Sequence, residues 1–69
     1  MAFNDGVRVM RVNDLYEKNR MRDFVVITVK NGVTTPVRRG VLSPSRDADV
    51  LCSEVKDWYE TNKNITVFI

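Results

Sequence analysis

The chain has 69 residues, of which 43% are hydrophobic and 29% are charged, a composition typical of a single folded domain and unlike a disordered chain. Its formal net charge of +2 is too small to indicate a class of partner by itself. No stretch approaches the roughly 18 consecutive apolar residues of a membrane-spanning helix. The start of the chain lacks the apolar core of a secretory signal, and Cys52 is the sole cysteine. We therefore expect one domain over residues 1–69, in the reducing cytoplasm and without a membrane partner.

The first part of the chain combines a strand candidate with a short helix. Residues 7–12 interleave valine with arginine and predict a strand, with a slip in the pattern that indicates a bulge or a change of face. Asn13-Asp14 then offers a helix cap, and Leu15 and Tyr16 share one helical face. This pattern predicts a helix of about two to three turns that ends near Asn19.

Residues 24–41 predict a β-hairpin. Phe24–Val29 is apolar on both faces, which is typical of an interior strand. Asn31-Gly32 follows, and this pair tolerates the positive φ angles of a tight hairpin turn. The returning strand, Val33–Val41, contains Pro36, which cannot donate a ladder hydrogen bond. We expect this strand at an edge of the sheet or interrupted by a bulge.

The last third of the sequence predicts a second helix and a final strand. Ser43-Pro44-Ser45 is a typical helix start. Downstream, an apolar stripe at helical spacing predicts one helix up to residues 62–64, and its members are Leu51, Val55, Trp58 and Tyr59. We expect Trp58 in the core and Tyr59 at its margin. Ile65–Ile69 has high β-propensity and predicts a strand.

The predicted order is β-α-β-β-α-β, which indicates an α+β fold, a small ferredoxin-like two-layer sandwich. The first crossover is short for a parallel connection, so a three-stranded antiparallel sheet packed by one main helix is the alternative. The uncharged final strand has to lie between other strands or pair with another chain. In the ferredoxin-like order it lies at an edge, and we therefore predict a possible homodimer through this strand.

The usual catalytic groups are missing from the sequence. It contains no histidine, and its three glycines are scattered, so no imidazole-based triad and no phosphate-binding loop can be assembled. One cysteine without histidine cannot form a structural zinc site, and we expect Cys52 to pack as a small hydrophobic residue. The acidic residues are expected on solvated surfaces. We therefore predict a protein that is not an enzyme and that uses no cofactor or metal.

Arginine is the main functional lead. Seven arginines stand against four lysines, and the net charge is +5 over residues 1–46 and −3 over residues 47–69. The guanidinium group suits two-point contacts with carboxylates and phosphates. Tyrosine and other aromatic side chains are frequent at the centres of protein interfaces. The candidate binding residues are Arg20, Arg22, Arg38, Arg39, Arg46, Tyr59 and Phe68.

These features predict a small non-catalytic protein-binding regulator or inhibitor that docks through an arginine-rich surface or an exposed strand edge, a class that includes viral host-modulating proteins. The alternative is a nucleic-acid-binding protein whose arginines contact phosphates. RNA-recognition domains of this element order carry base-stacking aromatics on their first and third strands. Neither residues 7–12 nor residues 33–41 contain an aromatic side chain, so the protein-binding hypothesis is preferred.

Overall fold

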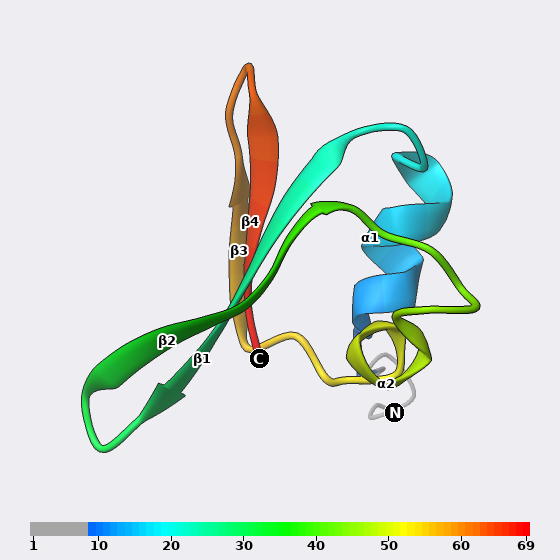
Figure 1. Ribbon diagram of the computed structural model, residues 1–69. Helices are drawn as coiled ribbons and strands as arrows, with labels where there is room; N and C mark the ends of the chain where they lie inside the picture. Colours follow the sequence, from blue (N-terminus) through cyan, green and yellow to red (C-terminus); the bar gives the residue numbers. More distant parts are fainter. Residues whose placement is uncertain (1–8) are drawn as a thin grey trace, which may run out of the picture.

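The computed structural model describes residues 9–69, which form a two-layer α+β structure (Figure 1). Within this range the chain forms two helices and four strands, in the order α1 (Val12–Lys18), β1 (Asp23–Lys30), β2 (Val33–Val41), α2 (Ala48–Leu51), β3 (Asp57–Glu60) and β4 (Asn64–Phe68). The sheet is mixed, in the order β2-β1-β4-β3. β1 runs parallel to β4, and the other two strand pairs are antiparallel. The expected α+β class is confirmed, but the ferredoxin-like strand order is not.

The β1–β2 hairpin forms where the sequence predicts it. Asn31 has φ 52° and Gly32 has φ 78°, as a turn with two left-handed residues requires. β1 lies inside the sheet between β2 and β4, and β2 lies at an edge. The register shifts between Val26 and Ile27, so that Val26 faces Arg38 while Ile27 faces Pro36. β2 therefore combines both expected features, the edge position and a bulge beside its proline.

The predicted first strand is wrong over the part that the structure describes. Residues 7 and 8 of that prediction lie outside the described residues, and residues 9 and 10 have no regular structure. Arg11 forms an isolated bridge with Glu54. Its backbone N–H donates to Asp14 Oδ2 (2.9 Å), and the Asp14 N–H donates back to the Arg11 carbonyl oxygen (2.9 Å). These reciprocal bonds begin α1 at Val12, with Arg11 as the cap in place of the expected Asn13-Asp14, and the helix ends at Lys18, next to the expected Asn19.

The predicted long second helix is also wrong. α2 covers Ala48–Leu51 only, and Asp57–Glu60 forms the edge strand β3 instead. The chain turns away after Cys52, where the Val55 N–H donates to the Met10 carbonyl oxygen (2.8 Å). The Lys56 N–H then donates to the Phe68 carbonyl oxygen (2.7 Å) and starts the pairing with β4. Without β3, the strand β4 would form an open edge of the sheet. The pairing of residues 57–60 with β4 therefore outweighs the helical spacing of the apolar residues in this segment.

β4 is an interior strand, so the expected homodimer through its edge is not possible in this fold. It pairs with β1 on one side and with β3 on the other. This arrangement confirms the condition that the uncharged strand has to lie between others. The edges of the sheet are β2 and β3. The three-stranded antiparallel alternative is not found either, because the sheet has β3 as a fourth strand and is mixed.

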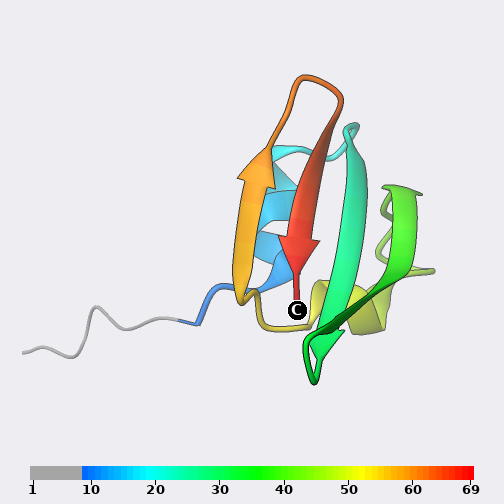
Figure 2. The same ribbon diagram turned by 90° about the vertical axis from the view of Figure 1, so that its left-hand side faces the viewer.

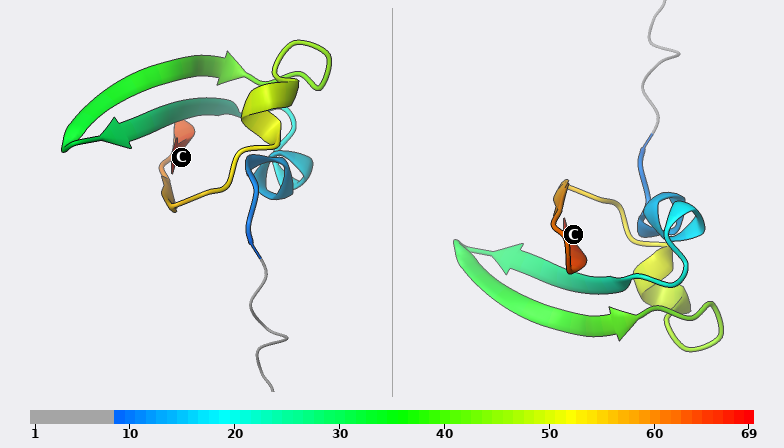
Figure 3. Two further views of the ribbon diagram at one scale, coloured as in Figure 1. Left: turned by 90° about the horizontal axis from the view of Figure 1, so that it is seen from below. Right: turned by 90° about the horizontal axis from the view of Figure 1, so that it is seen from above.

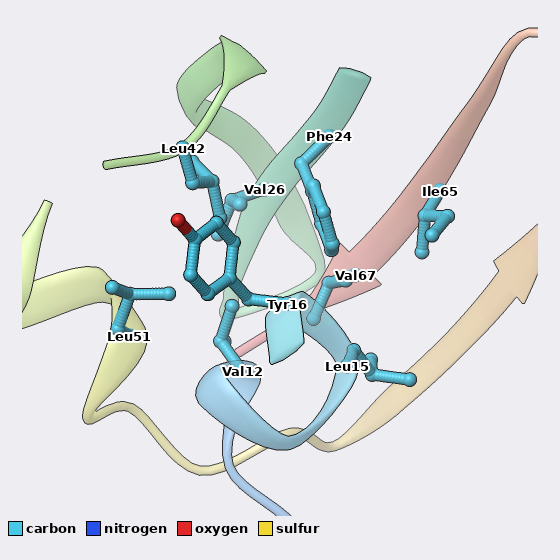
Figure 4. Close-up of a cluster of buried hydrophobic side chains, with 9 residues drawn as sticks. All are labelled: Val12, Leu15, Tyr16, Phe24, Val26, Leu42, Leu51, Ile65 and Val67. Atoms are coloured by element: carbon cyan, nitrogen blue, oxygen red, sulfur yellow. The ribbon is translucent and has the colours of Figure 1, made fainter. Parts of the chain in front are cut away.

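The core lies between α1 and one face of the sheet (Figure 4). Phe24 and Val26 alternate on β1, and Ile65 and Val67 alternate on β4, so all four side chains point to the same face. The buried hydrophobic residues are Val12, Leu15, Tyr16, Phe24, Val26, Leu42, Leu51, Ile65 and Val67. Trp58, expected in the core, is 39% exposed on an edge strand. Cys52, expected to be packed, is exposed because the chain leaves the helix there.

Candidate binding surface

One face of the sheet is left without a helix by the described part of the chain. Both helices lie behind the strands in Figure 2, and the two end-on views show them on one side of the sheet (Figure 3). The residues that alternate with the core positions therefore point to the other side. We call this side the open face. Its central residues are Val25, Ile27, Pro36, Arg39, Asp57, Tyr59, Thr66 and Phe68.

Strand register arranges these eight residues in two rows across the sheet. The first row runs Arg39, Val25, Thr66, Tyr59 from β2 to β3, and the second runs Pro36, Ile27, Phe68, Asp57. Residues that face each other across neighbouring strands point to the same side of the sheet. The rows therefore form one continuous surface of eight neighbouring side chains.

The middle of the open face is mostly apolar and partly accessible, apart from Thr66, which is 6% exposed. Val25, Ile27 and Phe68 are half-buried although no described helix covers them, because neighbouring side chains of the twisted sheet shield them. The Tyr59 ring lies against the Phe68 ring, with centroids 6.3 Å apart and an angle of 40° between the planes. Tyr59 is 52% exposed. This surface offers accessible aromatic area held in place by the strand backbone.

The open face carries opposite charges on its two flanks. Arg39 lies on β2, and among residues 9–69 its guanidinium group makes no hydrogen bond or ion pair. Asp57 lies on β3, where its Oδ1 accepts a hydrogen bond from the Trp58 N–H (2.8 Å). No described cation lies within ion-pair distance of the Asp57 carboxylate. Both charges are thus available to a partner that covers the face.

The expected arginine cluster does not form, because three of its members are engaged elsewhere in the fold. Arg22 pairs with Glu60 and donates to the Thr61 carbonyl oxygen (2.6 Å), which ties it to the β3–β4 turn. Arg38 and Arg46 both bind Asp47 at the end of β2. Arg20 lies 6.0 Å from the centroid of the Tyr16 ring, on the helical layer. Of the predicted site residues, Arg39, Tyr59 and Phe68 share the open face; the rings of Tyr59 and Phe68 are neighbours, and Arg39 lies on the opposite flank.

Asp47 is a structurally important residue that is not among the candidate residues of the sequence analysis. It is 5% exposed, and its carboxylate accepts hydrogen bonds from Arg38 Nε (2.7 Å), the Ser43 N–H (2.9 Å) and Arg46 Nε (3.3 Å). Burial alone would raise the pKa of this carboxyl group, but the Arg38 and Ser43 hydrogen bonds and the two guanidinium charges outweigh it and hold the pKa below its usual value. Asp47 therefore fastens the loop after β2 to the sheet. The pair Arg46-Asp47 directly before a helix was the available signal.

The rest of the described surface offers little chemistry. A shallow depression of about 320 Å³ borders the open face beside Arg39, Gly40 and Asn64. Within residues 9–69, no cluster of three or more histidine, cysteine, aspartate or glutamate side chains could hold a metal ion. In the same range no helix is long and apolar enough to cross a membrane. Comparisons of the chain with protein families, curated proteins and solved structures find no match.

Proposed function

We propose that this protein is a small non-catalytic regulator or inhibitor that binds another protein through the open face of its sheet. The observation that carries the proposal is the uncovered sheet face itself, with Tyr59 exposed beside Phe68 on one flank and Arg39 on the other flank. Tyrosine and arginine are over-represented among the residues that dominate protein-binding energy. An apolar centre flanked by charges is the usual composition of a protein interface.

The shape of the surface favours a macromolecular partner over a small molecule. Ligand pockets are usually concave and bury most of the ligand, whereas the open face is a sheet surface bordered by one shallow depression. Cys52 is an exposed free thiol, which suits a reducing compartment and supports the cytoplasm as the site of action.

Affinity capture with matched variants tests the proposal. The wild-type chain, an Arg39→Glu variant and a Tyr59→Thr variant are used as baits in lysate of the native host, with Arg20→Glu as the control. Arg20→Glu makes the same charge reversal on the helical layer. We expect the wild type and the control to recover one stoichiometric protein, and both open-face variants to lose it. Equal recovery by all four baits would refute this surface as the binding site.

A nucleic-acid partner is the second candidate, favoured by one observation. Tyr59 and Phe68 place aromatic rings on an open sheet face that also carries Arg39, the kind of platform on which unpaired bases stack. Against it, Asp23 and Asp57 share that face, and Arg22, Arg38 and Arg46 already bind within the protein. A gel-shift titration with single-stranded RNA and DNA at low salt tests this candidate. The absence of a shift would eliminate it.

A further inference from the structure

Arg39 and Asp57 occupy opposite flanks of the open face, and a third charged residue, Asp23, lies between them on β1, one row beyond Val25. Arg39 is on the outer strand β2 and shares its row with Tyr59, which is on the outer strand β3 at the other flank. Asp57 is next to Tyr59 on the same face, one row further along β3. The outer strands of the face therefore carry a positive charge on β2 and a negative charge on β3, with Val25, Ile27, Thr66 and Phe68 between them.

This charge arrangement is self-complementary for one way of stacking two copies. A two-fold axis parallel to the strands lays β2 of one copy over β3 of the other and keeps the two rows in line. Each Arg39 then meets the Tyr59 ring and the Asp57 carboxylate of the other copy. A two-fold axis across the strands would instead lay β2 over β2 and bring like charges together, which is unfavourable.

The apolar centre fits the same arrangement. The two inner strands flank the axis, so β1 of one copy covers β4 of the other, and Ile27 meets Phe68. The distal part of the β1–β2 hairpin lies outside the two rows; past the end of β4 it bends away from the helical layer, toward the side of the open face (Figures 1 and 3). Aligned sheets of this kind usually pack with a small angle between strand directions, which allows Arg39 to reach from its own row toward Asp57.

We propose that the open face is covered by a second copy of this chain, related by a two-fold axis parallel to the strands, with Arg39 of each copy contacting Asp57 and Tyr59 of the other. The inference rests on the proposed function in one respect, the assignment of the open face as the binding surface. It replaces the edge-to-edge homodimer, which the interior position of β4 excludes.

A charge-swap experiment tests the arrangement. Sedimentation equilibrium of the wild type up to millimolar concentration is expected to show a dimer. Arg39→Asp and Asp57→Arg are each expected to weaken the dimer by about tenfold or more, because each change creates two like-charge contacts per dimer. An equimolar mixture of the two variants is expected to form a heterodimer of wild-type strength. In that pair the aspartate introduced at position 39 faces the arginine introduced at position 57, and the two remaining native side chains face each other.

Controls separate this inference from the proposed function. Arg20→Asp carries the same charge reversal outside the open face and should leave the dimer unchanged. Far-ultraviolet circular dichroism and thermal melting check that each variant is folded. A strictly monomeric wild type overturns the inference, as does a dimer that neither single variant weakens or that mixing does not restore. If the wild type is monomeric and Tyr59→Thr still loses a captured host protein, the proposed function stands and the second copy is excluded as the occupant.

Discussion

Replacing Asp47 with asparagine removes the charge at the best-buried polar contact described in this fold. The Asp47 side chain is buried, and its carboxylate accepts three hydrogen bonds, two of them from guanidinium groups. An asparagine can still accept through its carbonyl oxygen, but its amide group would point donor hydrogens at an arginine. Asp47→Asn therefore weakens the attachment of the loop after β2 without creating a cavity.

The size of the effect follows from the exposure of the partners. Hydrogen bonds to charged groups contribute about 1.5–3 kcal/mol each when both groups are buried. Arg38 and Arg46 are 27% and 59% exposed, so water can solvate them once the carboxylate charge is lost. We expect Asp47→Asn to lower the free energy of unfolding at pH 7 by about 2 kcal/mol. For a domain of this size that corresponds to a fall in Tm of roughly 8–16 °C.

The pH dependence gives a sharper test. The pKa of Asp47 is held below its usual value of 3.8 in the folded protein. A lowered folded-state pKa means that the ionised carboxylate stabilises the fold above the unfolded-state pKa, and that this stability is lost as pH falls through the folded-state pKa. The difference in unfolding free energy between wild type and Asp47→Asn should thus shrink below about pH 5.

Urea titrations of both proteins from neutral to acidic pH measure this difference directly. Asp49→Asn is the control, since Asp49 is an exposed acid on the same short helix and its replacement should cost only a few tenths of a kcal/mol, roughly. A difference that stays constant down to the lowest pH would refute the role assigned to the Asp47 charge. A loss at pH 7 equal to that of the control would do the same.

Three further substitutions probe the hairpin, the core and the surface. Gly32→Ala should lower the free energy of unfolding by about 1–2 kcal/mol in urea titration, because Gly32 has φ +78°, which is unfavourable for alanine. Nothing lies within 4 Å of the added carbon, so the loss comes from the backbone conformation and not from a clash. An unchanged stability would contradict the left-handed turn. Ile65→Val, at a fully buried position, should lower the free energy of unfolding by about 0.5–1.5 kcal/mol, seen as a lower urea midpoint with an unchanged m-value; a change in m would indicate a rearranged core. Glu60→Gln should cost less than about 1 kcal/mol, because the Arg22 and Glu60 side chains are 29% and 52% exposed and water screens their ion pair. A loss above that in 1 M salt would contradict a surface ion pair.

Local sequence signals predicted the β1–β2 hairpin correctly. Asn31-Gly32 specifies its turn through backbone conformation alone, and Pro36 excludes an interior position for β2 through its missing donor. α1 was likewise predictable, because Val12, Leu15 and Tyr16 recur at helical spacing and are all buried. These elements depend on residues that are neighbours in the sequence.

The second half of the chain could not be predicted in the same way. Val55, Trp58 and Tyr59 match a helical stripe, yet residues 57–60 form a strand because β4 needs a partner on its outer side. That requirement arises only when β4 has already paired with β1. Tertiary pairing overrides a local pattern of this length.

The candidate surface could likewise be predicted only in part from the sequence. Arg39, Tyr59 and Phe68 were selectable from residue type, but their grouping depends on the register of all four described strands. The other arginines were selected for the same chemical reason and failed as a cluster. Arg22, Arg38 and Arg46 are bound by acids and carbonyl groups that only the folded chain brings near them.

The described sheet consists of two local hairpins, β1–β2 and β3–β4, joined along one parallel seam between β1 and β4. The paired residues of this seam are separated by on the order of forty positions, so its closure has a larger entropic cost than either hairpin turn. A two-stranded hairpin alone is marginally stable in water. Folding should therefore be limited by the meeting of the two hairpins, and the chain split between α2 and β3 should yield two fragments that are unstructured apart and fold when mixed.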